Sequence, residues 1–166
     1  MIKIEDMMTR HPHTLLPSNT IEDALSLMTE HDIRHVPVVN ESNKLLGIVS
    51  HRDILKAQDS SLDKAHTNGT HRPYVYPLSD IMNKNIMTVS PIAGLKESAI
   101  FMQKHKVGCL PIIDHGQLTG IITDSDFVSI AINLLELQEE TEPDEIDPED
   151  EIESDELEPD EINRKR

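Results

Sequence analysis

The sequence predicts a mixed α/β (α+β) fold built from two copies of one β-α-β-β-α unit. Three observations lead to this fold class. Residues 6–40 match residues 80–114 in one register, so the chain contains an internal repeat. Each copy alternates short apolar runs, which are typical of strands, with apolar stripes at helical spacing. The length of 166 residues suits one domain or two small subdomains that share a core.

The repeat continues beyond these ranges after one residue is dropped in the second copy. Conservative pairs such as Val38 with Ile112 fill the positions between identical ones. Chance seldom produces so many matches in one register, so the pattern predicts two structurally equivalent halves. The identical pairs are Asp6 and Asp80, Met8 and Met82, Thr14 and Thr88, Pro17 and Pro91, Met28 and Met102, His31 and His105, Pro37 and Pro111, Leu45 and Leu118, Gly47 and Gly120, Ile48 and Ile121, and Asp53 and Asp126.

Each copy is expected to open with a short strand and a helix. The strands are predicted near residues 13–15 and 87–89, and Pro17 or its repeat equivalent ends them. Asn19 or Thr20 is expected to cap the first helix. The apolar stripes of the two helices are Ile21, Ala24, Leu25 and Met28 in the first copy and Leu95, Ala99 and Met102 in the second.

Two further strands and a second helix complete each copy. The second helices are predicted to open at Asp53 and Asp126, and the later one reaches about residue 137. The strands are predicted at residues 36–39 and 45–50 in the first copy and at residues 110–113 and 118–123 in the second.

A connection and a tail accompany the two copies. The connection contains Asn68-Gly69 and two prolines without clear periodicity, which predicts a linker loop. The tail is acidic, punctuated by proline and low in complexity, so we expect it to be disordered. The predicted boundaries are repeat 1 at residues 1–57, the linker at 58–79, repeat 2 at 80–137 and the acidic tail at 138–166.

Composition excludes several classes of protein. The formal net charge is −16, and residues 136–166 hold 16 acidic and three basic residues, so no nucleic-acid partner is expected. The single cysteine, Cys109, excludes an intramolecular disulfide and a multi-cysteine zinc site. No apolar run suits a transmembrane helix and no signal core appears, so we expect a cytoplasmic protein without a membrane partner.

Several motifs occur in the same order in both copies. The first copy carries Asp6-Met-Met-Thr9, Pro17, Arg34-His-Val-Pro-Val-Val39 and Gly47-Ile-Val-Ser-His-Arg-Asp53. The second carries Asp80-Ile-Met82, Pro91, Cys109-Leu-Pro-Ile-Ile113 and Gly120-Ile-Ile-Thr-Asp-Ser-Asp126. This ordered set resembles the cystathionine-β-synthase (CBS) domain pair, or Bateman module, of the stand-alone bacterial type. The resemblance covers roughly residues 1–135.

The resemblance implies a fold and a kind of function. The two repeats are expected to pack face to face with pseudo-two-fold symmetry and to form two quasi-equivalent clefts. Members of the family commonly bind adenine nucleotides there: AMP, ADP, ATP, S-adenosylmethionine or cyclic dinucleotides. Many form homodimers, and the family is regulatory, usually without catalysis of its own.

The Gly-x-x-Ser/Thr-x-x-Asp element supplies the first candidate site residues. By resemblance, Asp53 and Asp126 accept hydrogen bonds from ribose hydroxyls, and Ser50 and Thr123 donate to a phosphate. A carboxylate can accept from two vicinal hydroxyls, and a helix N-terminus favours an anion. The alternative is a helix capping box, which the same spacing produces without any ligand.

The remaining candidates follow from the same resemblance. Ile48 and Ile121 would pack on adenine, or else belong to the sheet core. Arg34, His35 and Arg52 would meet phosphates, and the second copy has Gly108-Cys109 in place of Arg34-His35. The two clefts are therefore predicted to differ, with the Asp53 cleft taking the more highly charged ligand. Thr14 and Thr88 would read the adenine edge through their backbones.

The sequence lacks the usual patterns for a metal or for catalysis. The nine histidines form no HExxH or equivalent zinc pattern, so no metal and no prosthetic group are expected. No nucleophile elbow, P-loop or dinucleotide fingerprint occurs, so the chain is not expected to be an enzyme. A metal-dependent hydrolase using Asp124, Asp126 and histidines is a weaker hypothesis.

Two function hypotheses remain in competition. The first is a regulatory module that binds an adenine nucleotide between its repeats and signals by conformational change to an effector protein. The second is an interaction scaffold that acts through its dimer face and its acidic tail, independently of nucleotide. In the scaffold, isolated apolar residues within the tail would dock on a partner's basic, apolar groove.

Overall fold

The computed structural model describes residues 1–68 and 75–139, with residues 60–68 described by their backbone. Residues 1–130 form one compact unit that contains both repeats, and a second unit begins at Ala131. Helices, strands and two short 3₁₀ helices (η) confirm the mixed α/β class. Their order is η1 (Ile4–Asp6), β1 (Thr9–Arg10), α1 (Ile21–Glu30), β2 (His35–Val39), β3 (Leu45–Ser50), α2 (His51–Asn68), η3 (Leu78–Asp80), α3 (Leu95–His105), β4 (Cys109–Asp114), β5 (Gln117–Thr123) and α4 (Asp124–Glu139).

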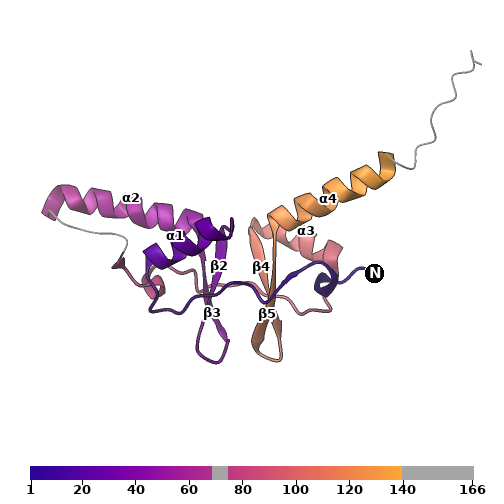
Figure 1. Cartoon of the computed structure of the whole chain (residues 1–166), viewed down its shortest axis with the longest axis horizontal. Coiled ribbons are helices and arrows are strands. Elements are labelled where there is room, and N and C mark those ends of the chain that lie inside the picture. Colours follow the sequence, from indigo (N-terminus) through magenta and orange to yellow (C-terminus); the bar gives the residue numbers. More distant parts are fainter. Residues whose placement is uncertain (69–74, 140–166) are drawn as a thin grey trace, which may run out of the picture. The chain divides into compact units, whose positions relative to one another are not determined.

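The first repeat consists of the antiparallel hairpin β2–β3 with helices α1 and α2 beside it (Figure 1). Helix α1 begins where predicted, because Thr20 forms a capping box with Asp23. The Asp23 amide donates to Thr20 Oγ1 at 3.2 Å and the Thr20 amide donates to Asp23 Oδ2 at 2.8 Å. The buried face of α1 contains Ile21, Ala24 and Met28, three of the four residues of the predicted stripe.

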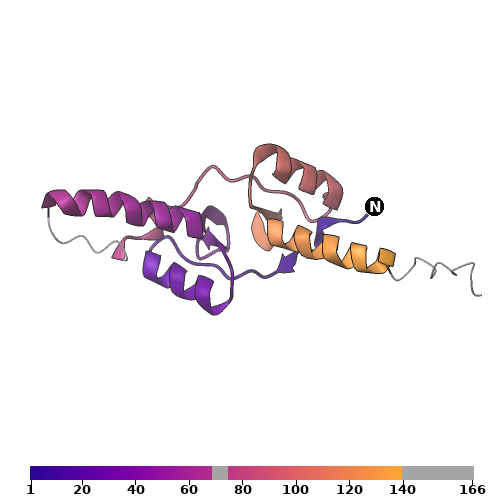
Figure 2. The same cartoon turned by 90° about the horizontal axis from the view of Figure 1, so that it is seen from above.

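The second repeat has the same arrangement in β4, β5, α3 and α4 (Figure 1), and Figure 2 shows the paired helices of each repeat from above. In this repeat the sheet has three strands in the order β1-β5-β4. Both hairpins carry an irregularity at equivalent places, between Val38 and Val39 and between Ile112 and Ile113. The predicted equivalence of the two halves therefore extends to details of strand pairing.

The predicted opening strands are reduced to single bridges. Leu15 pairs with Val38 and Val89 pairs with Ile112, each in parallel, while Thr14 and Thr88 lie outside any strand. A proline follows each bridge after a single intervening residue, and it cannot donate a ladder hydrogen bond, so pairing does not extend. The regular strand near the N-terminus is β1, four residues before the expected place.

Three predicted boundaries were wrong. Helices α2 and α4 begin two residues earlier than expected, at His51 and Asp124, because Ser50 and Thr123 are the caps. Helix α2 continues to Asn68, eleven residues into the predicted linker loop, because no proline or glycine interrupts residues 58–68. Helix α4 includes the first two residues of the predicted tail, and the tail from residue 140 lies outside the described residues.

The segment that precedes each repeat in the chain packs into the core of the other repeat. Ile4, near the start of the chain, is fully buried in the core of the second repeat with Leu110 and Ile122. Its repeat equivalent, Leu78, is fully buried in the core of the first repeat. Strand β1 likewise pairs with β5 of the second repeat, Thr9 opposite Ile121. The two repeats thus exchange their opening segments, which ties them into one unit.

Two further contacts hold the repeats together. Ile48 of β3, Cys109 of β4 and Ile121 of β5 form one buried cluster. At the hairpin turns, the Leu118 amide donates to the Asn43 carbonyl at 3.1 Å, and Asn43 Nδ2 donates to the Leu118 carbonyl at 2.9 Å. The sheets therefore meet through an apolar centre and a polar link between turns. Among the described residues, no helix has the length and apolar character to span a membrane.

Candidate nucleotide-binding cavity

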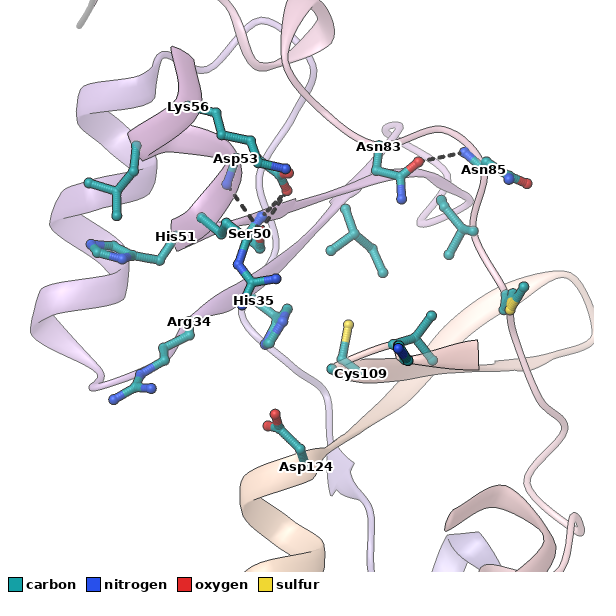
Figure 3. Close-up of a pocket in the computed structure, with 18 of the residues that line it drawn as sticks. Arg34, His35, Ser50, His51, Asp53, Lys56, Asn83, Asn85, Cys109 and Asp124 are labelled. Carbon is teal, nitrogen blue, oxygen red and sulfur yellow. Dashed lines mark hydrogen bonds between the residues drawn. The ribbon is translucent and has the colours of Figure 1, made fainter. Parts of the chain in front are cut away.

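A cavity of about 810 Å³ lies between the two repeats (Figure 3). This volume is within the range that small-molecule sites usually have. Both repeats contribute to its wall. The lining residues are Arg34, His35, Ile48, Ser50, His51, Arg52, Asp53, Leu55 and Lys56 from the first repeat, and Asn83, Asn85, Ile86, Met87, Lys106, Val107, Gly108, Cys109, Asp124 and Ser125 from the second.

Six of the eleven predicted site residues line this cavity. All six come from the first repeat, at the ends of β2 and β3 and the start of α2: they are Arg34, His35, Ile48, Ser50, Arg52 and Asp53. The other five do not line it: Thr14, Thr88, Ile121, Thr123 and Asp126. Ile121 and Thr123 belong to β5, Asp126 belongs to the first turn of α4, and the other two threonines precede α1 and α3.

Ser50 and Asp53 form a capping box at the start of α2. The Ser50 amide and the Ser50 hydroxyl both donate to Asp53 Oδ2, at 2.9 Å and 2.7 Å, and the Asp53 amide donates to Ser50 Oγ at 3.2 Å. The capping alternative is therefore present in the structure. Within the described residues Asp53 Oδ1 accepts no hydrogen bond, so it can accept from a ligand hydroxyl. The only proton of the Ser50 hydroxyl is already donated, which disfavours its predicted donation to a phosphate.

Thr123 and Asp126 repeat this geometry at the start of α4. The Thr123 amide and hydroxyl donate to Asp126 Oδ2 at 2.7 Å and 2.8 Å. The capping boxes of α2 and α4 have the same geometry. A capping box alone therefore does not show whether its aspartate binds a ligand. The distinction lies in the surroundings, since only the Asp53 box is part of the cavity described above.

Close packing explains the two glycines of the sheet strands. A Cβ at Gly47 would lie 2.5 Å from Met82 Sδ, and one at Gly120 would overlap Met8 Sδ. Each methionine belongs to one of the exchanged opening segments, so the glycines leave room for that exchange. A glycine inside a strand often marks such a close approach.

Arg34-His35 and Gly108-Cys109 line one and the same cavity. Assigning the first pair to one cleft and the second pair to the other was therefore wrong. The two pairs occupy equivalent positions in the two repeats, and both line the cavity that contains Asp53. Gly108 has a steric role there: a Cβ at this position would lie 3.0 Å from His35 Nε2. Because glycine has no Cβ, the His35 imidazole fits against this position.

Sequence reasoning missed most of the second repeat's contribution. Asn83, Asn85, Ile86 and Lys106 belong to no motif of the ribose or phosphate type. The signal that could have found them is the repeat itself, because face-to-face packing brings the opening segment of one repeat to the Asp53 side of the other. His51, an exposed residue at the start of α2, also lines the cavity.

The charges of the cavity are mixed but mainly positive. Arg34, Arg52, Lys56 and Lys106 are accompanied by two carboxylates, those of Asp53 and Asp124. Arg34, Arg52 and Lys56 lie around the start of α2, where the helix dipole adds positive potential, and Lys106 comes from the end of α3. The wall also has an apolar part, formed by aliphatic side chains from both repeats. Such a combination suits a ligand with one flat apolar end and one anionic end.

Burial shifts the pKa of two groups in the cavity. It lowers the pKa of His35 below its ordinary value, although the nearby carboxylates of Asp124 and Asp53 oppose this effect. It raises the pKa of the Cys109 thiol to about 12, and the same two carboxylates add to the rise. Cys109 is thus a buried, protonated thiol that packs as a small hydrophobic side chain.

Among residues 1–59 and 75–139, no group of three or more His, Cys, Asp and Glu side chains is arranged to hold a metal ion. Asp124 and Asp126, which the hydrolase hypothesis uses, belong to the first turn of α4. Asp126 is engaged in the cap, and Asp124 Oδ1 accepts from the Ser125 amide at 2.9 Å. Both carboxylates are thus accounted for by local helix geometry.

The family follows from a match to the whole repeat pair. The family model for the CBS domain matches residues 4–60 and 78–133. The chain belongs to the CBS domain family. Both copies of the internal repeat are therefore CBS domains, and the cavity lies between them. No catalytic family accompanies this match.

Curated relatives include both small and large proteins. The chain is 31% identical over 133 residues to the CBS domain-containing protein YhcV of Bacillus subtilis, covering 80% of this chain and 86% of that protein. It is 33% identical over 123 residues to a homoserine O-acetyltransferase of Methanococcus vannielii, covering 72% of this chain. It spans only 23% of that enzyme's length. The similarity thus concerns the CBS pair within a larger protein.

Solved structures share the fold over most of the chain. A chain from Vibrio cholerae named as an acetoin utilization protein (AcuB) is 60% identical with a TM-score of 0.72, and covers 86% of this chain and 99% of that one. CBSX2 in complex with AMP is 28% identical with a TM-score of 0.67, covering 81% and 99%. The CBS pair of MJ0100, in complex with 5'-methylthioadenosine and S-adenosyl-L-methionine, is 25% identical with a TM-score of 0.67, covering 81% and 98%. The predicted likeness to a stand-alone bacterial CBS pair is confirmed, and the chain is similar to the AcuB type.

Proposed function

We propose that this CBS pair is a non-catalytic regulatory module that binds an adenine nucleotide in the cavity between its repeats. The observation that carries the proposal is the composition of this cavity. One wall bears Asp53, whose Oδ1 accepts no hydrogen bond from the part of the chain that the structure describes. Another wall is aliphatic, and Arg34, Arg52 and Lys56 lie around the start of α2. These are the partners that a ribose, a purine and a phosphate require. Complexes of CBSX2 with AMP and of MJ0100 with adenosyl compounds support this ligand class.

Each part of the nucleotide has a proposed place. The ribose hydroxyls donate to Asp53 Oδ1. The base packs on Ile48 and on Ile86, which faces it from the other repeat. The phosphates lie toward Arg34 and Arg52, so ADP and ATP are favoured over S-adenosylmethionine. Thr123, Asp126 and Ile121 stay predictions for the second cleft, and Thr14 and Thr88 stay predictions for one cleft each. Ile121 is 6% exposed and packs with Ile48 and Cys109 in the sheet core.

Isothermal titration calorimetry of the full chain with AMP, ADP, ATP and S-adenosylmethionine tests the proposal. We expect dissociation constants in the micromolar range for the phosphorylated ligands and weaker binding of S-adenosylmethionine, because the cations of the cavity attract phosphate. Adenosine, which lacks phosphate, serves as the control for the base and ribose contacts. Failure of all these ligands to bind would contradict the proposal and favour the scaffold hypothesis.

The signal is proposed to pass from the CBS pair to an effector protein through a change in the relative angle of the repeats. A ligand that contacts both repeats prefers one angle, and this preference supplies the free energy of the change. The contact between the hairpin turns, Asn43 with Leu118, is a fixed point for such a rotation. The cytoplasmic location expected from the sequence stays a prediction, as does the identity of the effector.

We also propose that the chain forms a homodimer. Helix α4 exposes a row of aliphatic side chains at helical spacing: Val128 is 60% exposed, Ile132 50% and Leu135 58%. Burial of such a row against a second copy removes apolar surface from water, which stabilises the association. The same row serves the scaffold hypothesis, so a dimer alone does not distinguish the two functions.

A charge within this row is expected to disrupt the dimer. Replacing Ile132 with glutamate places a carboxylate in the apolar contact, and its desolvation is costly. Sedimentation equilibrium is expected to show a dimer for the wild type and a monomer for Ile132→Glu. The matched control is Asn133→Glu, which adds the same charge one position along the exposed part of α4. A wild type that sediments as a monomer would contradict the proposed dimer.

A further inference from the structure

His35 occupies a distinctive place in the cavity. It is the first residue of β2 and pairs across the hairpin with Ser50, the cap of α2. Side chains of directly opposed residues lie on the same face of a sheet about 5 Å apart. The imidazole therefore lies beside the N-terminus of α2, where anions are favoured. Figure 3 shows it between the Ser50–Asp53 box and the second repeat.

The ring is enclosed from both repeats. On the far side it meets Gly108, where a Cβ would lie 3.0 Å from Nε2 and 3.1 Å from Cε1. Asp124 of α4 is also near, since its Oδ2 would lie 3.7 Å from the same Cβ. The imidazole thus bridges the gap between the first repeat and the second. Any phosphate group near the start of α2 would lie against it.

Charged groups near His35 come from α2, from α4 and from the residue before it, and His51, Lys56 and Lys106 line the same cavity. Asp124 comes from α4, Asp53 and Arg52 come from α2, and Arg34 precedes it in the chain. The Cys109 thiol of β4 is protonated and adds no charge. The two carboxylates favour the imidazolium and the two guanidinium groups disfavour it, while burial is the largest influence and favours the neutral ring. In the ligand-free protein His35 is accordingly neutral near pH 7.

A bound phosphate would reverse this balance. A phosphate brings between one and two negative charges at neutral pH, and an anion in contact with the ring stabilises the imidazolium. The ring then donates a charge-assisted hydrogen bond, which is about twice as strong as a neutral one. Proton uptake and phosphate binding are in this way linked, and each promotes the other.

We propose that His35 takes up a proton when the phosphate of a nucleotide enters the cavity, so that this CBS pair binds phosphorylated nucleotides more tightly as the pH falls through the neutral range. This inference rests on the proposed nucleotide site and adds its regulation. The affinity changes between two limits. Above the pKa of His35 in the complex the ring is neutral with or without ligand, and below its pKa in the ligand-free protein, which burial lowers, the ring is charged in both states. One linked proton changes the affinity by at most about tenfold per pH unit.

The test is calorimetry with ADP near pH 6.5 in two buffers of different ionisation enthalpy, which yields the number of protons taken up on binding. We expect the wild type to take up between about half a proton and one proton more than His35→Gln. The titration of ADP itself is common to both proteins, so the difference between them belongs to His35. The matched control is His115→Gln, whose ring is 95% exposed at the β4–β5 turn and should match the wild type.

A second measurement does not depend on the variant's fold. The His35 ring signal of the full-length wild type, followed by NMR from pH 5 to pH 8, should report a pKa that ADP raises by about one unit or more. Binding of ADP without this shift, or with equal proton uptake in His35→Gln, would overturn the inference and leave the nucleotide site intact. Absence of ADP binding at every pH would overturn both. Proton uptake lost in His51→Gln instead would assign the linkage to His51.

Discussion

Replacing Asp53 with alanine is expected to weaken ADP binding by about 10- to 100-fold. The variant loses the hydrogen bonds from the ribose hydroxyls to the carboxylate, and hydrogen bonds to a charged group contribute about 1.5–3 kcal/mol. In the structure Asp53 Oδ2 is occupied by Ser50, whereas Oδ1 is directed to the ligand in the proposed complex. Calorimetry with ADP on the full chain measures the effect directly.

The internal repeat supplies the control for this experiment. Asp126 has the same cap at the start of α4, so Asp126→Ala should lose the same helix stability, about 1 kcal/mol, without loss of ADP affinity. Equal destabilisation of both variants in urea, together with loss of binding in Asp53→Ala alone, would separate ligand contact from capping. Loss of binding only in Asp126→Ala would place the main site in the second cleft and contradict the assignment made here.

Replacing Ile4 with alanine is expected to lower the free energy of unfolding by about 2–5 kcal/mol. Ile4 is fully buried in the core of the second repeat, next to Leu110, Ile112 and Ile122. Truncation leaves a cavity there, even though the residue stands near the start of the chain. Urea denaturation followed by circular dichroism gives the magnitude, and hydrogen exchange of the β4 and β5 amides locates it.

Ile2 provides the matched control, because it is 54% exposed and only two residues away. Ile2→Ala should change the free energy of unfolding by less than about 0.5 kcal/mol. If Ile4→Ala were no more destabilising than Ile2→Ala, the exchange of opening segments between repeats would be wrong. Faster hydrogen exchange confined to the β2 and β3 amides would instead assign Ile4 to the core of the first repeat.

The internal repeat made most elements predictable. Helices α1 and α3 and the two hairpins occur where the apolar spacing placed them, because each buries a stripe of its own residues in a local core. The predicted α1 cap is also confirmed, since Thr20 and Asp23 interact within one turn. These helices, hairpins and caps depend on residues close together in the sequence, so the residue pattern is enough to predict them.

The errors concern features that depend on distant partners. The short strands near residues 13–15 and 87–89 have only one parallel bridge each, to Val38 and to Ile112, and a proline stops each pairing from extending. Strand β1 exists only because β5 of the other repeat is there to pair with it. Propensity carries no information on either point, and so the sequence placed the N-terminal strand a few residues too late.

The same division applies to the site. From the first repeat, the motif residues Ser50 and Asp53 and the basic pair Arg34-His35 could be named in advance, because their types suit ribose and phosphate. The sequence did not indicate which residues of the second repeat face them. Gly108, Asp124 and Asn83 do so only because of the way the two repeats pack. A repeated pattern of residues is enough to specify two equivalent units and their local caps. Which side chains share a cavity is settled by the contact between those units, since that contact joins residues far apart in the chain and creates the burial that shifts His35.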